Sequence, residues 1–270
     1  PLQECGDGPV TGDYNPMDEF QDADDTQVYI LHEGSGLNIE NPLDTNATDP
    51  IFGFDSNTMT YGTTYYISAV VGNNDGGGTV DLDDPCLAVA QGTPVVFDEI
   101  PTANLMGTTA ICEGDDANLS VEFTGPGPWS IIYTDENGQD TLTGINTNPF
   151  NFNVTPSSSS TVTLDQVMNP DCPGIAMGTA DITVNTAVQV SGVSTTCNAT
   201  ATGYTVSFQI SGGDPNSYII STNHGGSIDP TGFFTSNEIT APNGYSFTVN
   251  DANNCNPIIV TDDEVICDCT

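Results

Sequence analysis

Gly62-Thr-Thr-Tyr-Tyr-Ile-Ser-Ala-Val-Val71 is the stretch that decides the fold of this 270-residue chain. It is rich in the β-branched and aromatic residues that favour strands. Apolar residues alternate with polar ones in further stretches on its carboxyl side: Leu119/Val121/Phe123, Trp129/Ile131/Tyr133, Phe150/Phe152/Val154 and Tyr204/Val206/Phe208/Ile210. This period of two predicts strands with one buried face.

Turn signals separate these stretches. They are Asn137-Gly138, Asn148-Pro149, Thr155-Pro156, the Gly-Gly-Asp-Pro run at 212–215, and Asn243-Gly244. Short strands with turns at intervals of about 8–12 residues are typical of β-sandwiches. No segment combines a helical period with capping residues. The sequence therefore predicts an all-β chain.

Two short joints divide the chain into units of 1–100, 101–185 and 186–270. Ile100-Pro101-Thr102 follows one strand pattern, and Asn185-Thr186 follows another. Each unit is long enough to bury a core of its own. Because the joints lack a Gly/Ser-rich linker, we expect three tandem sandwiches in an elongated, semi-rigid rod.

The charge composition is one-sided. The chain has no Lys and no Arg, and its formal net charge is -37. Nothing can neutralise phosphates, so the sequence excludes nucleic-acid partners and adhesion to anionic lipid by charge. No stretch approaches 18 apolar residues, so no membrane insertion is expected. The absence of Lys also rules out the Lys–Asn isopeptide bonds that lock many bacterial surface domains.

Such acidity can indicate disorder, but the hydrophobic content argues against it. Hydrophobic residues make up 36% of the chain, including 11 Phe and 9 Tyr. We therefore expect a folded protein. We expect no leader sequence within these residues, and we expect the chain to be a segment of a longer polypeptide.

The chain has eight cysteines: Cys5, Cys86, Cys112, Cys172, Cys197, Cys255, Cys267 and Cys269. A zinc site needs close pairs with a second pair or a His nearby, and Cys267-Asp-Cys269 is the only close pair. Disulfides fit better. The spacing suggests one bond within each unit: Cys5–Cys86, Cys112–Cys172 and Cys197–Cys255. Each would contribute about 4 kcal/mol and requires an oxidising compartment. Cys267 and Cys269 are left without partners in this scheme. They could bond each other, or one of them could bond a following segment of the longer chain.

Several phrases resemble repeats of giant surface proteins of Bacteroidetes. Residues 101–184 carry P-T-A-N-L, A-I-C-E-G, F-T-G-P-G-P-W, V-T-P-S-S-S-S-T-V-T-L and D-C-P-G, which resemble an immunoglobulin-like repeat. Y-G-T-T-Y-Y-I-S-A-V-V-G-N at 61–73 and V-D-L-D-D-P-C-L at 80–87 resemble a domain that often precedes it. S-G-G-D-P at 211–215 and F-T-V-N-D-A-N-N-C at 247–255 resemble the repeat of gliding-motility adhesins.

The resemblance covers nearly the whole chain and implies three tandem immunoglobulin-like domains. It also implies export, a place on the bacterial cell surface, and adhesion or filament formation. One departure concerns the cysteines, since immunoglobulin domains place them in strands B and F around a core Trp. Here Cys112 precedes the expected strand B and Cys172 lies in an Asn-Pro-Asp loop. We expect their bond to join a loop to a strand edge, and Trp129 to fill the core.

Acidic clusters are the candidate metal sites, because calcium takes six to eight oxygen ligands. Asp81, Asp83 and Asp84 lie just before Cys86, and Asp22 and Asp24 form a second group. The alternative is that these are solvated loops, since clusters arise by chance among 37 acids. None matches the twelve-residue calcium loop, and no cofactor is required by the sequence.

Catalytic signals are weak. His32 and His224 are too few for a metal centre, and no G-x-S-x-G motif is present. No catalytic residue is assigned, and the chain is predicted not to be an enzyme; a calcium-dependent acidic enzyme is the least favoured alternative. Asp140-Thr141-Leu142 matches the O-glycosylation signal of this phylum, so Thr141 is a candidate. The sequons at Asn46, Asn118, Asn153 and Asn198 are attributed to chance in an Asn/Thr-rich chain.

Two functions from different classes remain. The first is a non-enzymatic structural stalk of a large extracellular adhesin or surface filament, whose partners are neighbouring repeats. The second is a carbohydrate- or protein-binding module, which would recognise surface glycans through exposed aromatic side chains. The candidates for that role are Tyr61, Tyr65, Tyr66, Phe233 and Phe234.

Overall fold

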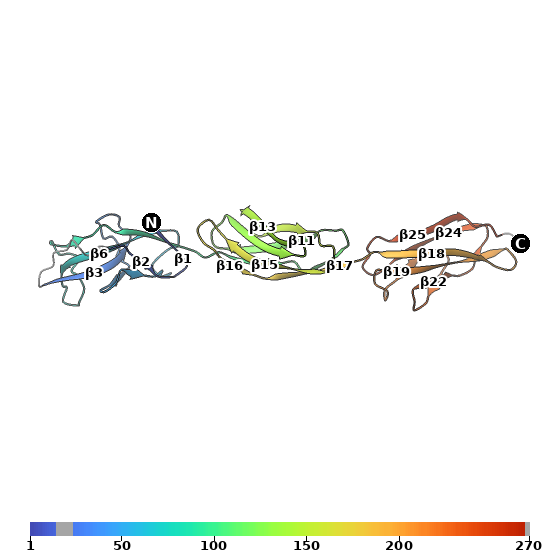
Figure 1. The fold of residues 1–270 in the computed structure, drawn as a ribbon, viewed down its shortest axis with the longest axis horizontal. Coiled ribbons are helices and arrows are strands. Elements are labelled where there is room, and N and C mark those ends of the chain that lie inside the picture. The colour runs from blue at the N-terminus through green and yellow to red at the C-terminus, as the bar shows by residue number, and fades with distance from the viewer. Residues whose placement is uncertain (15–23, 268–270) are drawn as a thin grey trace.

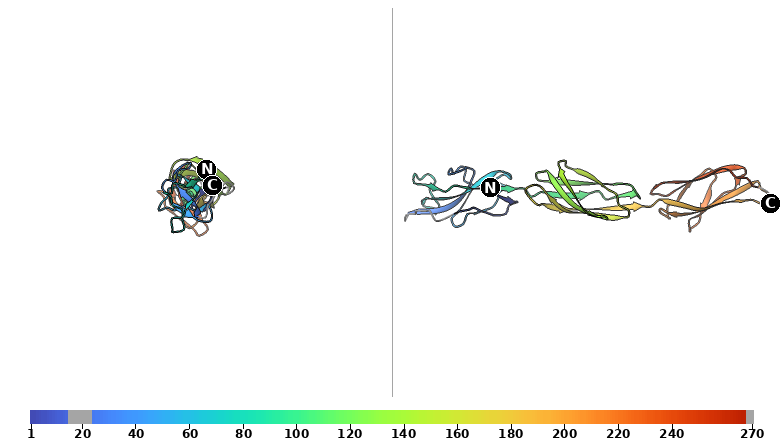
Figure 2. Two further views of the ribbon diagram at one scale, coloured as in Figure 1. Left: turned by 90° about the vertical axis from the view of Figure 1, so that its left-hand side faces the viewer. Right: turned by 45° about the horizontal axis from the view of Figure 1, so that its top comes forward.

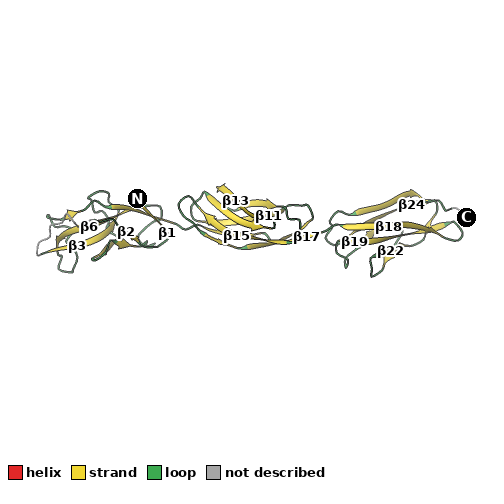
Figure 3. Ribbon diagram, viewed as in Figure 1, coloured by secondary structure: helices red, strands yellow, loops and turns green. Residues whose placement is uncertain are grey.

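The computed structural model describes residues 1–14 and 24–267. The described residues form strands, turns and loops without a helix (Figure 3). Three β-sandwiches follow one another end to end (Figure 1), and the view along the long axis shows them superimposed (Figure 2). The prediction of an all-β rod of three immunoglobulin-like domains is confirmed. Within the described ranges, no segment is a helix that could cross a membrane.

The middle domain shows the architecture most completely. Its strands are β9 (Thr102–Met106), β10 (Thr109–Cys112), β11 (Ala117–Thr124), β12 (Trp129–Asp135), β13 (Gly138–Ile145), β14 (Phe150–Val154), β15 (Ser160–Met168), β16 (Ile175–Met177) and β17 (Thr179–Asn185). One sheet has the order β10-β17-β15-β12-β13, and the other β14-β11-β9-β16. In immunoglobulin lettering, the first sheet has the order A′-G-F-C-C′, and strand A′ (β10) runs parallel to strand G (β17). The second sheet has the order E-B-A, and β16 adds a further strand beside A.

The core of the middle domain follows from the alternation in its strands. Leu119, Val121 and Ile131 point inward and are fully buried. Trp129 stacks on Phe123 with ring centroids 4.7 Å apart and fills the core as predicted.

The first domain repeats the larger sheet. Its strands are β1 (Leu2–Cys5), β2 (Val10–Thr11), β3 (Asp25–His32), β4 (Asp44–Asn46), β5 (Ile51–Phe52), β6 (Thr64–Asn73), β7 (Ala88–Val89) and β8 (Thr93–Asp98). The order β1-β8-β6-β3-β4 is again A′-G-F-C-C′, with β1 parallel to β8. β2 and β5 pair on the opposite face. The Tyr-Tyr-Ile-Ser-Ala-Val-Val stretch forms β6, the central strand F.

The third domain has the simpler arrangement of constant-type immunoglobulin domains. Its strands are β18 (Val188–Cys197), β19 (Gly203–Gly212), β20 (Ile219–Ser221), β21 (Gly226–Ile228), β22 (Phe233–Ser236), β23 (Ile239–Thr240), β24 (Asn243–Asn250) and β25 (Ile258–Glu264). The orders β18-β19-β22-β21 and β20-β24-β25 correspond to A-B-E-D and C-F-G. Phe208, Phe234 and Phe247 form the aromatic centre of its core.

Each domain has two distinct ends along the rod. The chain enters at what we call the leading end, which also carries the loop between strands F and G, the F–G loop. Strand G finishes at the trailing end, beside the last residue of strand A′, as the pairs Cys5↔Asp98 and Cys112↔Asn185 show. Among the described residues, every strand pairing lies within one domain.

Candidate functional site at the domain junctions

The described cysteines form two disulfides between domains and one within a domain. Cys5 bonds Cys172, with Cα atoms 5.7 Å apart, and so joins the first domain to the middle one. Cys112 bonds Cys255, at 5.5 Å, and joins the middle domain to the third. Cys197 bonds Cys267 inside the third domain. Multiple disulfides are typical of proteins that mature in an oxidising compartment.

The predicted pairings Cys5–Cys86, Cys112–Cys172 and Cys197–Cys255 are therefore wrong. The reason lies in the topology of the sandwich. Cys112 ends strand A′ at the trailing end, whereas Cys172 lies in the F–G loop at the leading end. A seven-residue strand such as β17 spans about 23 Å, and a disulfide needs Cα atoms within about 7 Å. A cysteine at one end of a domain reaches the F–G loop of the next domain instead.

At the first junction the linker is packed from both sides. Pro101 is buried, and its carbonyl accepts a 2.9 Å hydrogen bond from the amide of Ile175 in the F–G region of the middle domain. A Cβ on Gly174 would lie only 2.1 Å from the oxygen of Pro101. On the other side, a Cβ on Gly6 would meet the side chain of Ile100 at 2.8 Å. The linker is therefore clamped between the two domains.

Two carboxylates face each other across the first junction. Asp98 ends strand G of the first domain, and one of its carboxylate oxygens is buried without a hydrogen-bond partner among the described residues. Burial raises the pKa of Asp98, and the charge of Asp171 raises it further. Asp171 directly precedes Cys172, and its carbonyl lies 3.5 Å from the sulfur of Cys5. With no Lys or Arg in the chain to neutralise them, the covalent bond holds these like charges together.

At the second junction a buried aspartate positions the F–G loop. Asp251, 2% exposed, accepts a 2.6 Å hydrogen bond from the amide of Asp214 and a 3.1 Å bond from the amide of Asn254. Gly213, with φ +57°, allows this approach, since a Cβ there would lie 2.5 Å from the Asp251 carboxylate. The S-G-G-D-P and N-D-A-N-N-C phrases thus meet at one site and present Cys255 to the middle domain.

The two covalent links at each junction restrict bending. A single linker would let neighbouring domains rotate about one point. The disulfide adds a second point, which leaves rotation only about the line between them. At the first junction the hydrogen bond from Ile175 to Pro101 and the glycine contacts oppose that remaining rotation. The linker and the disulfide together therefore restrict the relative orientation of the two domains.

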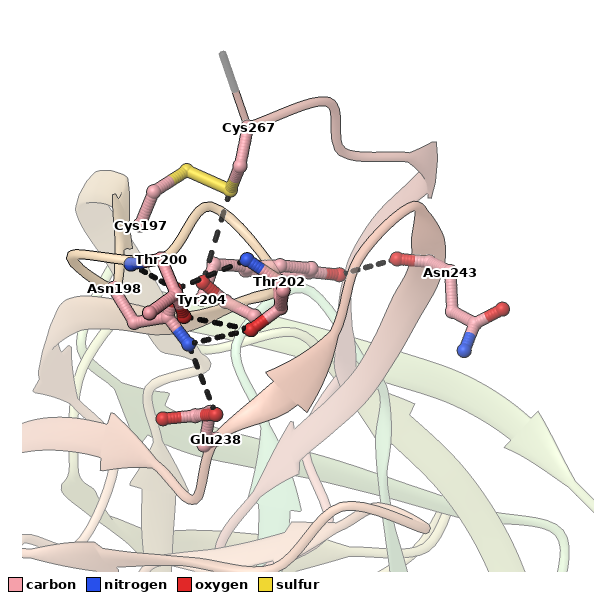
Figure 4. Close-up of a disulfide and its surroundings, with 9 residues drawn as sticks. Cys197, Asn198, Thr200, Thr202, Tyr204, Glu238, Asn243 and Cys267 are labelled. Carbon is pink, nitrogen blue, oxygen red and sulfur yellow. Dashed lines mark hydrogen bonds between the residues drawn. A yellow bond between two sulfur atoms is a disulfide. The ribbon is translucent and has the colours of Figure 1, made fainter. Parts of the chain in front are cut away.

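The third disulfide closes the trailing end of the third domain (Figure 4). It ties the end of β18 to the segment after β25, and the sulfur of Cys267 lies 3.8 Å from the carbonyl of Gly203. The adjoining turn is held by the side chain of Asn198, whose oxygen accepts the amides of Thr200 and Thr202 at 3.2 and 3.0 Å. Its amide donates to Glu238 at 3.2 Å. Asn198, one of the sequon residues, is thus fully used in the turn.

Two cysteines remain. Cys86 is an exposed free thiol in the F–G loop of the first domain, so its predicted disulfide is absent here. Cys269 lies outside the described residues.

The carboxylates proposed for calcium are used mainly within their own loop. Asp84 accepts the amides of Cys86 and Asn73, each at 2.9 Å, and these bonds lower its pKa, that from Cys86 most. Asp81 accepts the amide of Asp83 at 3.0 Å. Within residues 1–14 and 24–267, no three His, Cys, Asp or Glu side chains gather as metal ligands do. Asp22 lies outside those ranges, and Asp24 lines a shallow hollow with Asn73 and Asn74. The calcium site stays a prediction.

The aromatic candidates for ligand binding belong largely to the cores. Tyr65 and Phe234 are each 2% exposed. Tyr61 stacks on Phe54 with centroids 3.9 Å apart and donates a hydrogen bond to Asp7. Tyr66 stacks against His32, and Phe233 is left as an exposed ring.

The remaining candidates have ordinary structural places. His32 is buried on β3, with Nε2 2.8 Å from the hydroxyl of Ser68, and burial lowers its pKa. His224 is half-buried beside Phe247. Thr141 is exposed on β13, at the edge of its sheet, and its glycosylation stays a prediction.

Several residues of the junctions were not identified from sequence. Asp98, Gly174 and Asp251 act through backbone approach and burial, which leave no local pattern. The position of each cysteine in its domain is the feature that could have indicated the pairing. One cysteine of each domain ends the strand before B: Cys5, Cys112 and Cys197. Another lies between strands F and G: Cys86, Cys172 and Cys255.

Comparison with known proteins adds little beyond the fold. No protein-family model and no curated protein matches the chain. Among solved structures, it is similar to the N-terminal eight Ig domains of Down Syndrome Cell Adhesion Molecule, with 11% identity, a TM-score of 0.28, and coverage of 97% of this chain and 39% of that one. It is also similar to a marsupial T cell receptor (9% identity, TM-score 0.39, coverage 97% and 98%). The third is the structure of immunoglobulin domains 1–4 of Sidekick-1, with 8% identity, a TM-score of 0.36, and coverage of 98% of this chain and 73% of that one.

The chain thus spans less than half of the first of these structures. TM-scores this low carry no argument about function. The immunoglobulin-like assignment rests on the sheet orders and the strand pairing of the chain itself.

Proposed function

We propose that this chain is a stiff spacer, a structural stalk segment of a large extracellular bacterial adhesin or surface filament, without enzymatic activity. The observation that carries the proposal is the pair of disulfides that bridge consecutive domains, Cys5–Cys172 and Cys112–Cys255. Bonds placed between domains do little for the core of either one. They fix the angle between neighbouring domains. A fixed angle contributes to function only where the function depends on the shape of the whole rod.

The surface supports the same role. A net charge of -37 without any Lys or Arg makes neighbouring stalks repel each other and keeps a crowded surface soluble. The absence of Lys and Arg also removes every cleavage site for trypsin-like proteases. The alternative, a carbohydrate- or protein-binding module, has less support, because Tyr65 and Phe234 are buried and Tyr61 is hydrogen-bonded.

Small-angle X-ray scattering tests the proposed stiffness. A compact protein of this length has a radius of gyration of about 18 Å. Three domains in series, each at least one long strand in length, give roughly 100 Å, and a thin rod of that length has a radius of gyration of about 30 Å. We expect the rod value for the oxidised chain.

The decisive comparison removes the junction bonds. A variant with Cys5, Cys112, Cys172 and Cys255 changed to Ser should lose extension, whereas one with Cys197 and Cys267 changed to Ser should keep it. Both are measured in about 1 M salt, where a Debye length of about 3 Å removes charge repulsion as a cause of straightness. Equal scattering curves for the two variants would contradict the proposed role of the junctions.

A further inference from the structure

The free thiol of Cys86 occupies the position that is bonded in the other two domains. Cys172 and Cys255 lie in the F–G loops of their domains, and each is bonded to the cysteine that ends strand A′ of the preceding domain. Cys86 lies in the F–G loop of the first domain, between β6 and β8. The same position is therefore used twice for an inter-domain bond and is left open once.

Burial separates the two cases in the same way. Cys172 and Cys255 are each 1% exposed, and each is bonded to a cysteine at the trailing end of the preceding domain. Cys86 is exposed, and so is the neighbouring Leu82, at 39%. Cys86 therefore differs from the two bonded cysteines in exposure as well as in bonding.

The loop also holds its cysteine as the bonded loop of the middle domain does. The amide of Cys86 donates to a side-chain oxygen of Asp84 at 2.9 Å, as the amide of Cys172 donates to Asn169 at 2.6 Å. Asp84 in addition accepts the amide of Asn73 at the end of β6, which fixes the loop to its strand. The thiol is thus presented at a defined place on the leading end of the first domain.

We propose that Cys86 receives a third inter-domain disulfide, from the cysteine that ends strand A′ of another immunoglobulin-like domain, carried by the same polypeptide on the amino side of the first domain. This inference rests on the proposed stalk function. Both observed bonds join domains that are consecutive along the chain, first to middle and middle to third, and the third bond continues that series. The partner is another domain of the same build.

The chemistry is that of the other bonds. The thiol of Cys86 and the thiol of the partner lose two protons and two electrons and form one S–S bond. A protein disulfide of the thiol-oxidase class accepts the electrons and protons and becomes two thiols, in the same oxidising compartment that forms the three bonds seen here.

The test is disulfide mapping on the native long protein. Free thiols are blocked with N-ethylmaleimide during isolation, and the unreduced protein is cleaved at Asp and Glu, because it offers trypsin no site in this region. We expect the Cys86 peptide to be bonded to a peptide from outside residues 1–270. Its cysteine should be followed by Gly-Asp or Glu-Gly-Asp, as Cys5 and Cys112 are.

Three results would overturn the inference. They are a maleimide-blocked Cys86, a Cys86–Cys86 dimer, and a bond from Cys86 to Cys197, Cys267 or Cys269 of a second copy. A blocked Cys86 in a chain that still scatters as a disulfide-held rod would remove this inference and leave the stalk function intact.

A second measurement uses the 270-residue chain itself. A maleimide-linked polyethylene glycol should label Cys86 in the folded chain within minutes, and the Cys86→Ser variant should lose that labelled peptide. In the native long protein the same residue should be protected until the protein is reduced. Failure to label Cys86 in the folded 270-residue chain would show that the loop is closed to any partner.

Discussion

At the scale of single residues, the junctions depend on places where no side chain fits. Gly174 brings the F–G loop of the middle domain onto the carbonyl of Pro101, and a Cβ would lie 2.1 Å from that oxygen. The contact involves backbone on the linker side, so it cannot be relieved by rotating a side chain. The loop or the linker must move.

Gly174→Ala should therefore lower the free energy of unfolding of the middle domain by about 1–3 kcal/mol, the usual cost of overpacking. Trp129 is the single tryptophan and lies in that domain, so urea unfolding followed by its fluorescence reports on it alone. As a control for the substitution itself, Gly77→Ala in the first domain, where a Cβ meets only the Asp75 side chain at 3.3 Å, should leave the first-domain transition unchanged in calorimetry. An unchanged midpoint for Gly174→Ala would show that the clamp is not tight.

A second residue-scale prediction concerns pH. Burial lowers the pKa of His32, so the unfolded chain binds a proton first as the pH falls below about 6.5. The stability that depends on neutral His32 is complete above that pH and is lost as the pH falls toward the folded-state pKa. Calorimetry should show the first-domain melting temperature falling between pH 7 and 5.

The matched variant replaces both partners, His32→Leu with Ser68→Ala, which leaves no buried polar group unpaired. Its melting temperature should fall less over the same range. The pKa of Asp98 is shifted the other way, so its protonation stabilises the fold as the pH falls further. Equal pH slopes for the wild type and the double variant would mean that His32 is not the titrating group.

At the scale of elements, the three disulfides divide into two kinds. Cys197–Cys267 closes a loop of 70 residues within one domain and should stabilise that domain by about 4 kcal/mol. The other two bonds connect bodies that each have a complete core, so their main effect is on orientation.

Removing the bond within the third domain should therefore lower the melting temperature of that domain markedly. Removing Cys112 and Cys255 together should leave the melting of each domain within a few degrees of the wild type. Differential scanning calorimetry of the two double Ser variants checks this, with the first-domain transition as internal reference. A large loss of stability in the Cys112/Cys255 variant would mean that the junction supports a core.

The elements were predictable from sequence to the extent that local pattern defines them. The alternating stretches at Leu119–Phe123 and Tyr204–Ile210 form strands, and Trp129 fills its core, because burial of one face imposes a period of two. The joints at Pro101 and Thr186 fall between domains for the same reason: strand pattern stops there.

The prediction of the disulfide pairing was wrong because the pairing depends on which end of a sandwich each cysteine occupies. Regular spacing within each unit suggested bonds within units, but spacing does not report the direction of strands A′ and G. Once strand order is known, Cys5 and Cys86 lie at opposite ends of one domain, and the pairing follows. The partners of Asp251 and Gly174 could not be found either, since both act on backbone groups distant in sequence.

At the scale of the whole molecule, charge opposes the compact state. Thirty-seven carboxylates without a single Lys or Arg repel one another along the rod. Many are stabilised locally instead: Glu136 accepts the amides of Ser157 and Ser158, and Asp229 those of Thr231 and Phe233. Hydrogen bonds from backbone amides thus replace salt bridges as partners for the acids.

The melting temperature of the chain should consequently rise with ionic strength. Raising NaCl from about 0.01 M to 0.5 M shortens the Debye length several-fold, and we expect a gain of roughly 5 °C, equivalent to about 1–2 kcal/mol. Calcium and magnesium chloride at matched ionic strength form the control. A rise specific to calcium would support the predicted calcium site, and a melting temperature that does not respond to salt would contradict the repulsion.

The placement of the inter-domain bonds also decides how the rod responds to tension. In the middle domain, pulling force enters at Pro101 and at Cys172, and leaves at Cys112 and Asn185. The covalent path from residue 101 to residue 112 measures about 40 Å when straight, close to the length of the folded domain. The strands from B to the start of the F–G loop lie off that path and carry no load.

A domain loaded in this way is not extended by force when it unfolds, because most of its residues lie outside the covalent path. Force spectroscopy on oxidised chains should show no lengthening step from the middle domain, whereas reduced chains should release about 250 Å as its 85-odd residues unravel. A step of that size before reduction would show that the load passes through the core. The chain would then lengthen under load; with its bonds intact we expect it to behave as an inextensible tether, which transmits tension from one end to the other without lengthening.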